Sequence, residues 1–139
     1  MPLISNDNGA IDRSRLADWA TKEERVSVVA ASDAATTQSA ATLAGAAHTV
    51  YTMTPTASRA LTTPTGAELG AAFTDEGVGS SFRFSVSNLA ASTHPIVVTA
   101  GASGVTLVGA SATFSVAAAS SASFVAVFTA ANTVSVYRV

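Results

Sequence analysis

The chain has no cysteine, little charge and few aromatic residues. It carries seven Lys or Arg and nine Asp or Glu among 139 residues, for a net charge of −2. Without Cys there can be no disulfide and no thiolate-bound metal, so packing and self-association must supply the stability. Without a basic block the chain is not expected to bind nucleic acid, because such binding depends on neutralising phosphates.

Long apolar runs and targeting signals are missing as well. Hydrophobic residues make up 48% of the chain, but the longest uncharged stretch is too rich in Ser, Thr and Gly to cross a bilayer, so we expect no membrane partner. The first residues do not show a basic segment followed by an apolar one, as a secretory signal does. The pattern predicts synthesis in the cytoplasm and later incorporation into an assembly.

The sequence also lacks the motifs of catalytic and cofactor sites. It has no G-x-S-x-G turn, no glycine-rich loop followed by Lys and Ser or Thr, and no D-x-D-x-D loop. His48 and His94 are far apart, and neither has a second His or a Cys at the spacing of zinc ligands. Asp75 and Glu76 are adjacent, so their carboxylates point apart and suit a solvated helix end better than an acid/base pair. We therefore predict no catalytic residue, no metal site and no cofactor, and we expect the protein not to be an enzyme.

What the chain does have is a long stretch without ionic groups. No Asp, Glu, Lys or Arg lies between Arg83 and Arg138, although soluble domains carry charge on about a quarter of their residues. Either Ser, Thr and Asn side chains keep this surface hydrated, or other protein chains cover part of it, because the cores of interfaces are depleted in charge. Both explanations favour a structural assembly protein over an enzyme.

The same stretch alternates between apolar and small polar residues with a period of two. Phe82, Phe84 and Val86 share one face of a predicted strand. Further short strands at spacings of roughly ten residues, without helical periodicity between them, are typical of an antiparallel sandwich or barrel. We therefore predict an all-β fold, an antiparallel β-sandwich or barrel, over residues 25–139. Its buried core is expected to contain Phe82, Phe84, Val86, Leu107, Phe114, Phe124, Phe128 and Val136.

One short helix is expected to cap an open end of the sheets. It lies in residues 64–73, where Thr65 and Glu68 have the spacing of a capping box and Leu69 and Phe73 lie one turn apart. Residues 48–54 alternate cleanly and predict a strand that Pro55 ends. Residues 32–47, rich in Ala, Thr and Ser, are predicted to form a weak strand and loops, because Thr and Ser disfavour helix interiors.

Residues 1–24 are predicted to form an extended N-terminal arm. More than half of the charged residues lie in or just after this segment, and the single Trp, Trp19, shares one side of a weakly amphipathic turn with Leu16. In one interpretation these two side chains fold back on the chain's own sheet. In the other, the arm docks on a neighbouring protein, with Trp19 as the main contact and mixed charges around it. The second interpretation names these candidate partner-binding residues: Ile11, Arg13, Arg15, Leu16, Trp19 and Lys22.

Residues 50–139 resemble a β-rich module of structural proteins from tailed bacteriophages, seen in head decoration (cement) proteins and in some fibre-associated proteins. The likeness rests on four segments: the Pro-Thr-led helix at 64–73, the strand Val-Gly-Ser-Ser-Phe-Arg-Phe at 78–84, the hairpin Gly-Val-Thr-Leu-Val-Gly at 104–109 and the closing strand Val-Ser-Val-Tyr at 134–137. The chain departs from the module at Ala102 and Ser103, where the family often has a tighter turn.

The resemblance implies a structural virion protein that decorates and stabilises a phage capsid. It further implies a homotrimer on the capsid surface of the virion, bound to the major capsid protein through its arm and its uncharged sheet surfaces. The alternative is a fibre or spike-tip module that binds host surface glycan. Sugar-binding faces usually combine exposed aromatic and polar groups, whereas the sheet offers Tyr137 and little else, and the chain has no repetitive shaft. We therefore favour the capsid-decorating role.

Overall fold

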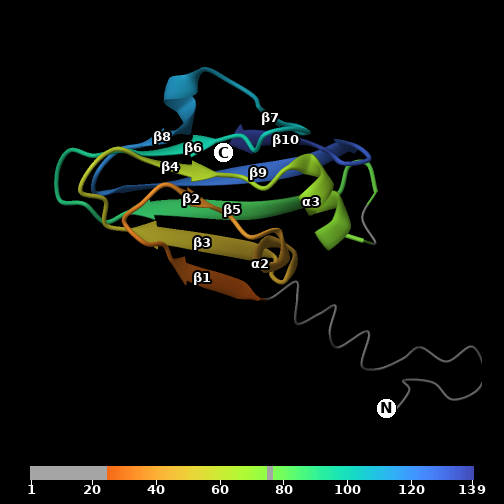
Figure 1. Cartoon of the computed structure of the whole chain (residues 1–139), viewed down its shortest axis with the longest axis horizontal. Coiled ribbons are helices and arrows are strands. Elements are labelled where there is room, and N and C mark those ends of the chain that lie inside the picture. Colours follow the sequence, from red (N-terminus) through yellow and green to blue (C-terminus); the bar gives the residue numbers. More distant parts are fainter. Residues whose placement is uncertain (1–24, 75–76) are drawn as a thin grey trace, which may run out of the picture.

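The computed structural model describes residues 25–74 and 77–139, which form two packed β-sheets with helices at one end (Figure 1). The six-stranded sheet contains, in spatial order, β1 (Val26–Ala30), β3 (His48–Met53), β5 (Ser81–Asn88), β9 (Ser120–Ala130), β10 (Thr133–Arg138) and β7 (Val105–Leu107). The four-stranded sheet contains β2 (Thr36–Thr37), β4 (Arg59–Thr62), β6 (Ile96–Thr99) and β8 (Ser115–Val116).

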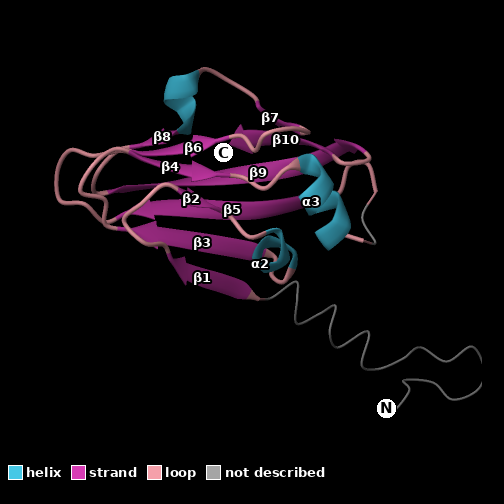
Figure 2. Cartoon of the chain, in the orientation of Figure 1, coloured by secondary structure: helices cyan, strands magenta, loops and turns pink. Residues whose placement is uncertain are grey.

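The chain alternates between the two sheets from β1 to β6. β1, β3 and β5 are parallel neighbours in one sheet, and β2, β4 and β6 are parallel neighbours in the other. Each pair of consecutive strands therefore makes one turn of a flattened coil, and the turns lie side by side (Figure 2). After β6 the path changes, because β8 pairs antiparallel with β6, and β9 runs antiparallel between β5 and β10. β7 lies parallel to β10 at the far edge.

The predicted all-β antiparallel sandwich or barrel is wrong. The fold is a mixed α/β one, whose sheets combine parallel and antiparallel strands. A period of two locates a half-buried strand, but it reads the same beside a parallel or an antiparallel neighbour. Short spacings between strands predict hairpins, yet from β1 to β6 each short link leads to the opposite sheet instead of to the adjacent strand.

Two short α-helices occupy equivalent places in successive turns of the coil. α2 (Ala40–Ala44) links β2 to β3, α3 (Gly66–Ala72) links β4 to β5, and the two helices contact each other. The predicted capping box is confirmed: the Thr65 hydroxyl accepts from the Glu68 amide at 3.2 Å, and the Glu68 carboxylate accepts from the Thr65 amide at 2.8 Å. We call this end of the sheets the helix end and the opposite end the loop end.

α2 corrects the prediction of a weak strand and loops over residues 32–47, and it is a second helix where one was expected. The Ser39 hydroxyl caps it by accepting from the Thr42 amide at 3.3 Å. Leu43 then inserts into the core at 1% exposure, as Leu69 does from α3. Tertiary burial of this leucine and the cap outweigh the low helix propensity of Thr.

The core between the sheets matches the predicted one closely. All seven predicted Phe and Val side chains, which lie on β5, β9, β10 and the 3-10 turn η1 (Ser111–Phe114), are 6% exposed or less. Phe84 stacks on Phe124, which stacks in turn on Phe114, with ring centroids 5.1 Å and 5.8 Å apart. Leu107 is only half-buried, because its strand β7 forms the edge of the sheet.

Candidate interaction surfaces

The predicted partner-binding residues lie outside the part of the chain that the structure describes. Ile11, Arg13, Arg15, Leu16, Trp19 and Lys22 all belong to residues 1–24, and Asp75 and Glu76 fall in the second gap. Within residues 25–74 and 77–139, two surfaces stand out, namely the outer face of the six-stranded sheet and the loop end.

The outer face is the side of the six-stranded sheet that is turned away from the four-stranded sheet. Side chains alternate along every strand, so the register of the sheet assigns them to one face or the other. The outer face contains Val26, Val28, Ala30, His48, Val50, Thr52, Arg83, Ser85, Ser87, Thr106, Ser121, Ser123, Val125, Val127, Ser135 and Tyr137. Arg83 is the one Asp, Glu, Lys or Arg in this set, so the face is built of valines and hydroxyls.

The valines of β1 are the most exposed large hydrophobic side chains of this face. Val26 is 57% exposed and Val28 is 67% exposed, although strand valines usually gain stability by burial. Neighbouring β3 and β5 continue the face with Val50 and the small hydroxyl Ser85. The described surface is therefore apolar and uncharged at its β1 edge.

A line of hydrogen bonds crosses the middle of the outer face. His48 Nε2 lies 2.6 Å from the Ser85 hydroxyl, which lies 2.8 Å from the Ser123 hydroxyl on the next strand. A serine beside a histidine is the geometry of an activated nucleophile. Here the two carboxylates of the described ranges are engaged elsewhere, Asp33 by Arg59 and Glu68 by Thr65, so neither orients the histidine ring as a triad requires.

The two histidines are at opposite ends of the sheet. His48 begins β3 at the helix end, and His94 lies in the loop before β6, where its carbonyl accepts from Asn88 at the end of β5. Over residues 25–74 and 77–139 there is no group of three or more His, Cys, Asp or Glu side chains that could hold a metal ion. Within the same ranges no helix is both long enough and apolar enough to span a bilayer.

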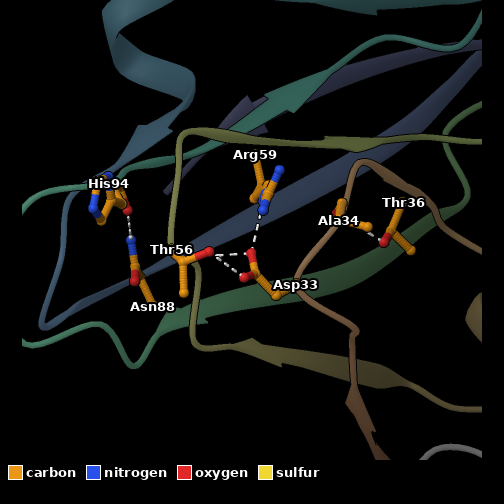
Figure 3. Close-up of polar contacts among 7 residues, drawn as sticks. All are labelled: Asp33, Ala34, Thr36, Thr56, Arg59, Asn88 and His94. Atoms are coloured by element: carbon orange, nitrogen blue, oxygen red, sulfur yellow. Dashed lines mark hydrogen bonds and ion pairs between the residues drawn. The ribbon is translucent and has the colours of Figure 1, made fainter.

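The loop end is formed by stacked turns from successive windings of the coil. Asp33 in the first turn accepts from the Thr56 amide at 3.2 Å, the Thr56 hydroxyl at 2.5 Å and Arg59 Nε at 2.6 Å in the second (Figure 3). The amide of Arg59 donates to the Pro95 carbonyl in the third turn at 3.1 Å. Asp33 and Arg59 thus tie three consecutive turns together.

Asn88 performs the same role deeper in the loop end. Its side chain is buried at 2% exposure, and its Nδ2 donates to the carbonyls of His94 and Val116, both at 3.0 Å (the first is drawn in Figure 3). Its Oδ1 accepts from the Ala90 amide at 3.1 Å. One amide side chain therefore joins the end of β5, the loop that follows it, and β8.

The backbone at the loop end adopts conformations that side chains disfavour. Thr93 and His94 have φ values of 58° and 63°, and Ala119 in the neighbouring loop has a φ of 54°. Non-glycine residues in this left-handed region are uncommon, and β-branched Thr is rarest of all. The surrounding hydrogen bonds, including that from the Ala119 amide to the Ala90 carbonyl at 2.8 Å, must hold these conformations.

Comparison of the chain with protein-family models, curated proteins and solved structures finds no match. Function must therefore be inferred from the surfaces and geometry described above.

The Asp33 contacts predict a loss of stability in acid. Its hydrogen bond to Arg59, followed by those from the Thr56 side chain and amide, holds the pKa of the Asp33 carboxyl well below its usual value of 3.8. A carboxyl with a lowered native pKa stabilises the fold above the unfolded-state pKa, and this contribution is lost as pH falls through the native value. We expect the free energy of unfolding to decline below about pH 4, and to decline less steeply in Asp33→Asn.

Chemical denaturation between pH 6 and pH 2 measures this slope. Glu68, whose pKa is lowered by the Thr65 backbone and hydroxyl, also contributes, so Glu68→Gln serves as the matched comparison at the helix end. Parallel pH profiles for the wild-type protein and Asp33→Asn would show that the Asp33 contacts do not stabilise the fold.

No sequence motif marks the roles of Asp33 and Asn88, and none links Val26 and Val28 to the outer face. Asp33 pairs with residues more than twenty positions away, so no short-range sequence pattern predicts its contacts. A signal for Asn88 is present, because it ends an alternating strand at a position where the inward face continues. An inward-facing amide at a strand end is a candidate organiser of the following loop.

Proposed function

We propose that this chain is a structural virion protein that decorates and stabilises a phage capsid. In this proposal the β-rich domain of residues 25–139 self-associates through its uncharged outer face. Residues 1–24 bind the major capsid protein, and the protein resides on the capsid surface.

The observation that carries the proposal is the composition of the outer face. Over the described strands, the outer face of the six-stranded sheet presents mainly valine and hydroxyl side chains, with Arg83 as its one Asp, Glu, Lys or Arg, and Val26 and Val28 are more than half exposed. Depletion of charge is what distinguishes the core of an interface from ordinary protein surface. Such a face suits a protein that is covered by other chains in an assembly.

The geometry also favours a mechanical role over a chemical one. Two polar side chains of the loop end are used within the fold: Asp33 ties successive turns and Asn88 is buried under its own loop. A protein that binds an assembled shell, but not its separate subunits, stabilises that shell by mass action. Several linked copies strengthen this effect, because each bound copy raises the effective concentration of the next.

The glycan-binding alternative gains no specific support. Tyr137, 39% exposed, is the aromatic side chain on the outer face. Val125 separates it from Arg83 across β9, so the aromatic and charged groups do not adjoin.

The composition of virions tests the role directly. If the proposal holds, mass spectrometry of purified virions of the phage whose genome encodes this chain will detect it in many copies, and electron microscopy will place it outside the shell. Virions that lack the protein, or that contain it in a few copies at a fibre tip, would overturn the capsid-decorating role.

Deletion of residues 1–24 is expected to abolish capsid binding while leaving the β-rich domain folded. The described strands and their core begin at Val26, so the deletion leaves all of the described strands in place. Co-sedimentation with undecorated capsids measures binding, and thermal unfolding followed by circular dichroism measures folding.

Trp19→Ala in the full chain provides a finer comparison, since an aromatic anchor usually dominates such a contact. A truncated protein that still co-sediments with capsids at the wild-type level would show that the arm is not the anchor.

A further inference from the structure

Among the described residues, β1 is paired on one side only and forms an edge of the six-stranded sheet. β1 is the last strand in the order of that sheet, and its one described neighbour is β3. The amide of Ala31 donates to the Thr52 carbonyl of β3 at 2.8 Å. Because backbone groups alternate in direction along a strand, those of Val26, Val28 and Ala30 point away from β3, toward the open edge.

Within the described part of the chain, this edge shows none of the features that usually protect a strand against association. The strand reads Val-Ser-Val-Val-Ala, without charge, proline or a bulge between residues 26 and 30. Natural proteins generally protect such edges with charged residues, proline, bulges or covering loops. In addition, Val26 and Val28 are 57% and 67% exposed. An unprotected strand flanked by exposed valines is a surface that another strand can extend.

A second copy of this chain is the occupant that fits the edge. A strand pairs antiparallel with an identical strand across a two-fold axis, so the same five residues satisfy both sides. Residues 26–30 carry no charge, so these strands of two copies meet without repulsion and no oppositely charged partner is called for. The other edge of the sheet, at β7, is shorter at three residues and so offers fewer backbone groups to a second strand.

We propose that two copies of the protein pair through β1, antiparallel, with Val28 on the two-fold axis. Val28 then opposes Val28 of the second copy, and Val26 opposes Ala30. The backbone N–H and C=O groups of Val26, Val28 and Ala30 face outward. Each of these residues therefore forms a hydrogen-bonded pair with the residue opposite it in the second copy. The two six-stranded sheets become one continuous sheet, and the valines of both outer faces adjoin.

This inference rests on the self-association part of the proposed function and adds to it a contact at the β1 edge, which joins the outer faces of two copies into one. It names two copies, whereas the phage resemblance implies three. Failure of the two proposals can be told apart, because capsid binding is measured on the arm deletion and the edge contact is measured on the free protein. A monomer that decorates capsids overturns the edge contact alone.

A single introduced cysteine tests the geometry, since the chain has none of its own. Opposed residues of a hydrogen-bonded antiparallel pair have Cα atoms about 5.5 Å apart, which is within the range that a disulfide spans. Mild oxidation of Val28→Cys in the full chain is expected to give a covalent dimer on a non-reducing gel at low protein concentration. Leu89→Cys, 56% exposed in the loop after β5, is the matched control and is expected to remain monomeric on the gel.

Introducing a charge into the edge strand tests the energetics. Native mass spectrometry of the wild-type protein is expected to give a dimer, and Val28→Lys is expected to raise its dissociation constant at least about tenfold, because two ammonium groups then face each other on the axis. Leu89→Lys should leave the dimer intact. Circular dichroism verifies that Val28→Lys is folded, as its exposure implies.

Three results would overturn the proposal: a wild-type monomer at micromolar concentration, a wild-type trimer, or equal crosslinking of the two cysteine variants. A Val28→Lys variant that dimerises as tightly as wild type would do the same.

Discussion

Replacing Phe84 with Ala is expected to lower the free energy of unfolding by about 3 to 5 kcal/mol. Phe84 is fully buried at 0% exposure in the middle of β5. Its ring stacks on that of Phe124 in the adjacent strand, with centroids 5.1 Å apart. The truncation removes most of this side chain and leaves a cavity that two rigid sheets cannot close.

Urea or guanidinium unfolding measures this loss as a shift in midpoint at unchanged slope. Leu89→Ala is the matched control, because Leu89 is 56% exposed and surface truncations usually change stability by less than about 0.5 kcal/mol. If Phe84→Ala unfolds at the same denaturant concentration as the wild-type protein, the ring does not belong to the core.

Asn88→Leu is expected to lower the free energy of unfolding by about 3 kcal/mol or more, because three hydrogen bonds worth about 1 kcal/mol each are lost. The carbonyls of His94 and Val116 and the amide of Ala90 lose their partner. Each is left in a region where Asn88 itself is 2% exposed, so water does not readily replace the missing amide.

The same substitution should release the strained loop. Thr93 and His94 have positive φ values, and the Asn88 side chain holds the His94 carbonyl in place. Without that bond these residues are expected to return toward negative φ. Amide hydrogen exchange should therefore accelerate over residues 89–95 more than in the strands.

Thr49→Val provides the contrast to Asn88→Leu. Thr49 is 0% exposed in β3, and its hydroxyl oxygen has no hydrogen-bond partner. Removing an unpartnered buried hydroxyl while keeping its shape is expected to leave stability unchanged or raise it, since no bond is broken and a desolvation penalty disappears. Equal destabilisation by Thr49→Val and Asn88→Leu would show that the hydrogen bonds of Asn88 are not the cause of its effect.

The uncharged surface is larger in the fold than the sequence predicts. From the sequence, the uncharged surface is confined to residues after Arg83. In the fold, β1 and β3 extend the same face with Val26, Val28 and Val50. The most exposed valines of the face thus come from the part of the chain that sequence patterns marked least clearly.

The repeated unit of the fold was also present in the sequence in a weak form. Ser39 and Leu43 have the same spacing as Thr65 and Leu69, and each pair supplies a helix cap and a buried leucine. The first unit is hard to recognise in the sequence because α2 consists mostly of Ala and Thr, and Thr is a poor helix former. The second unit is clear because Glu68 completes its capping box.

By itself, the sequence determined where most strands lie, where α3 begins and which phenylalanines are buried. These properties depend on near neighbours in the chain, through a period of two along strands and a cap three residues from its partner. The tertiary structure alone decided the directions of the strands, the joining of three turns by Asp33 and Arg59, and the open edge at β1. Each of these is set by pairing between distant residues, such as Val26 with His48 and His48 with Arg83, and a half-buried strand carries the same pattern whichever neighbour it receives.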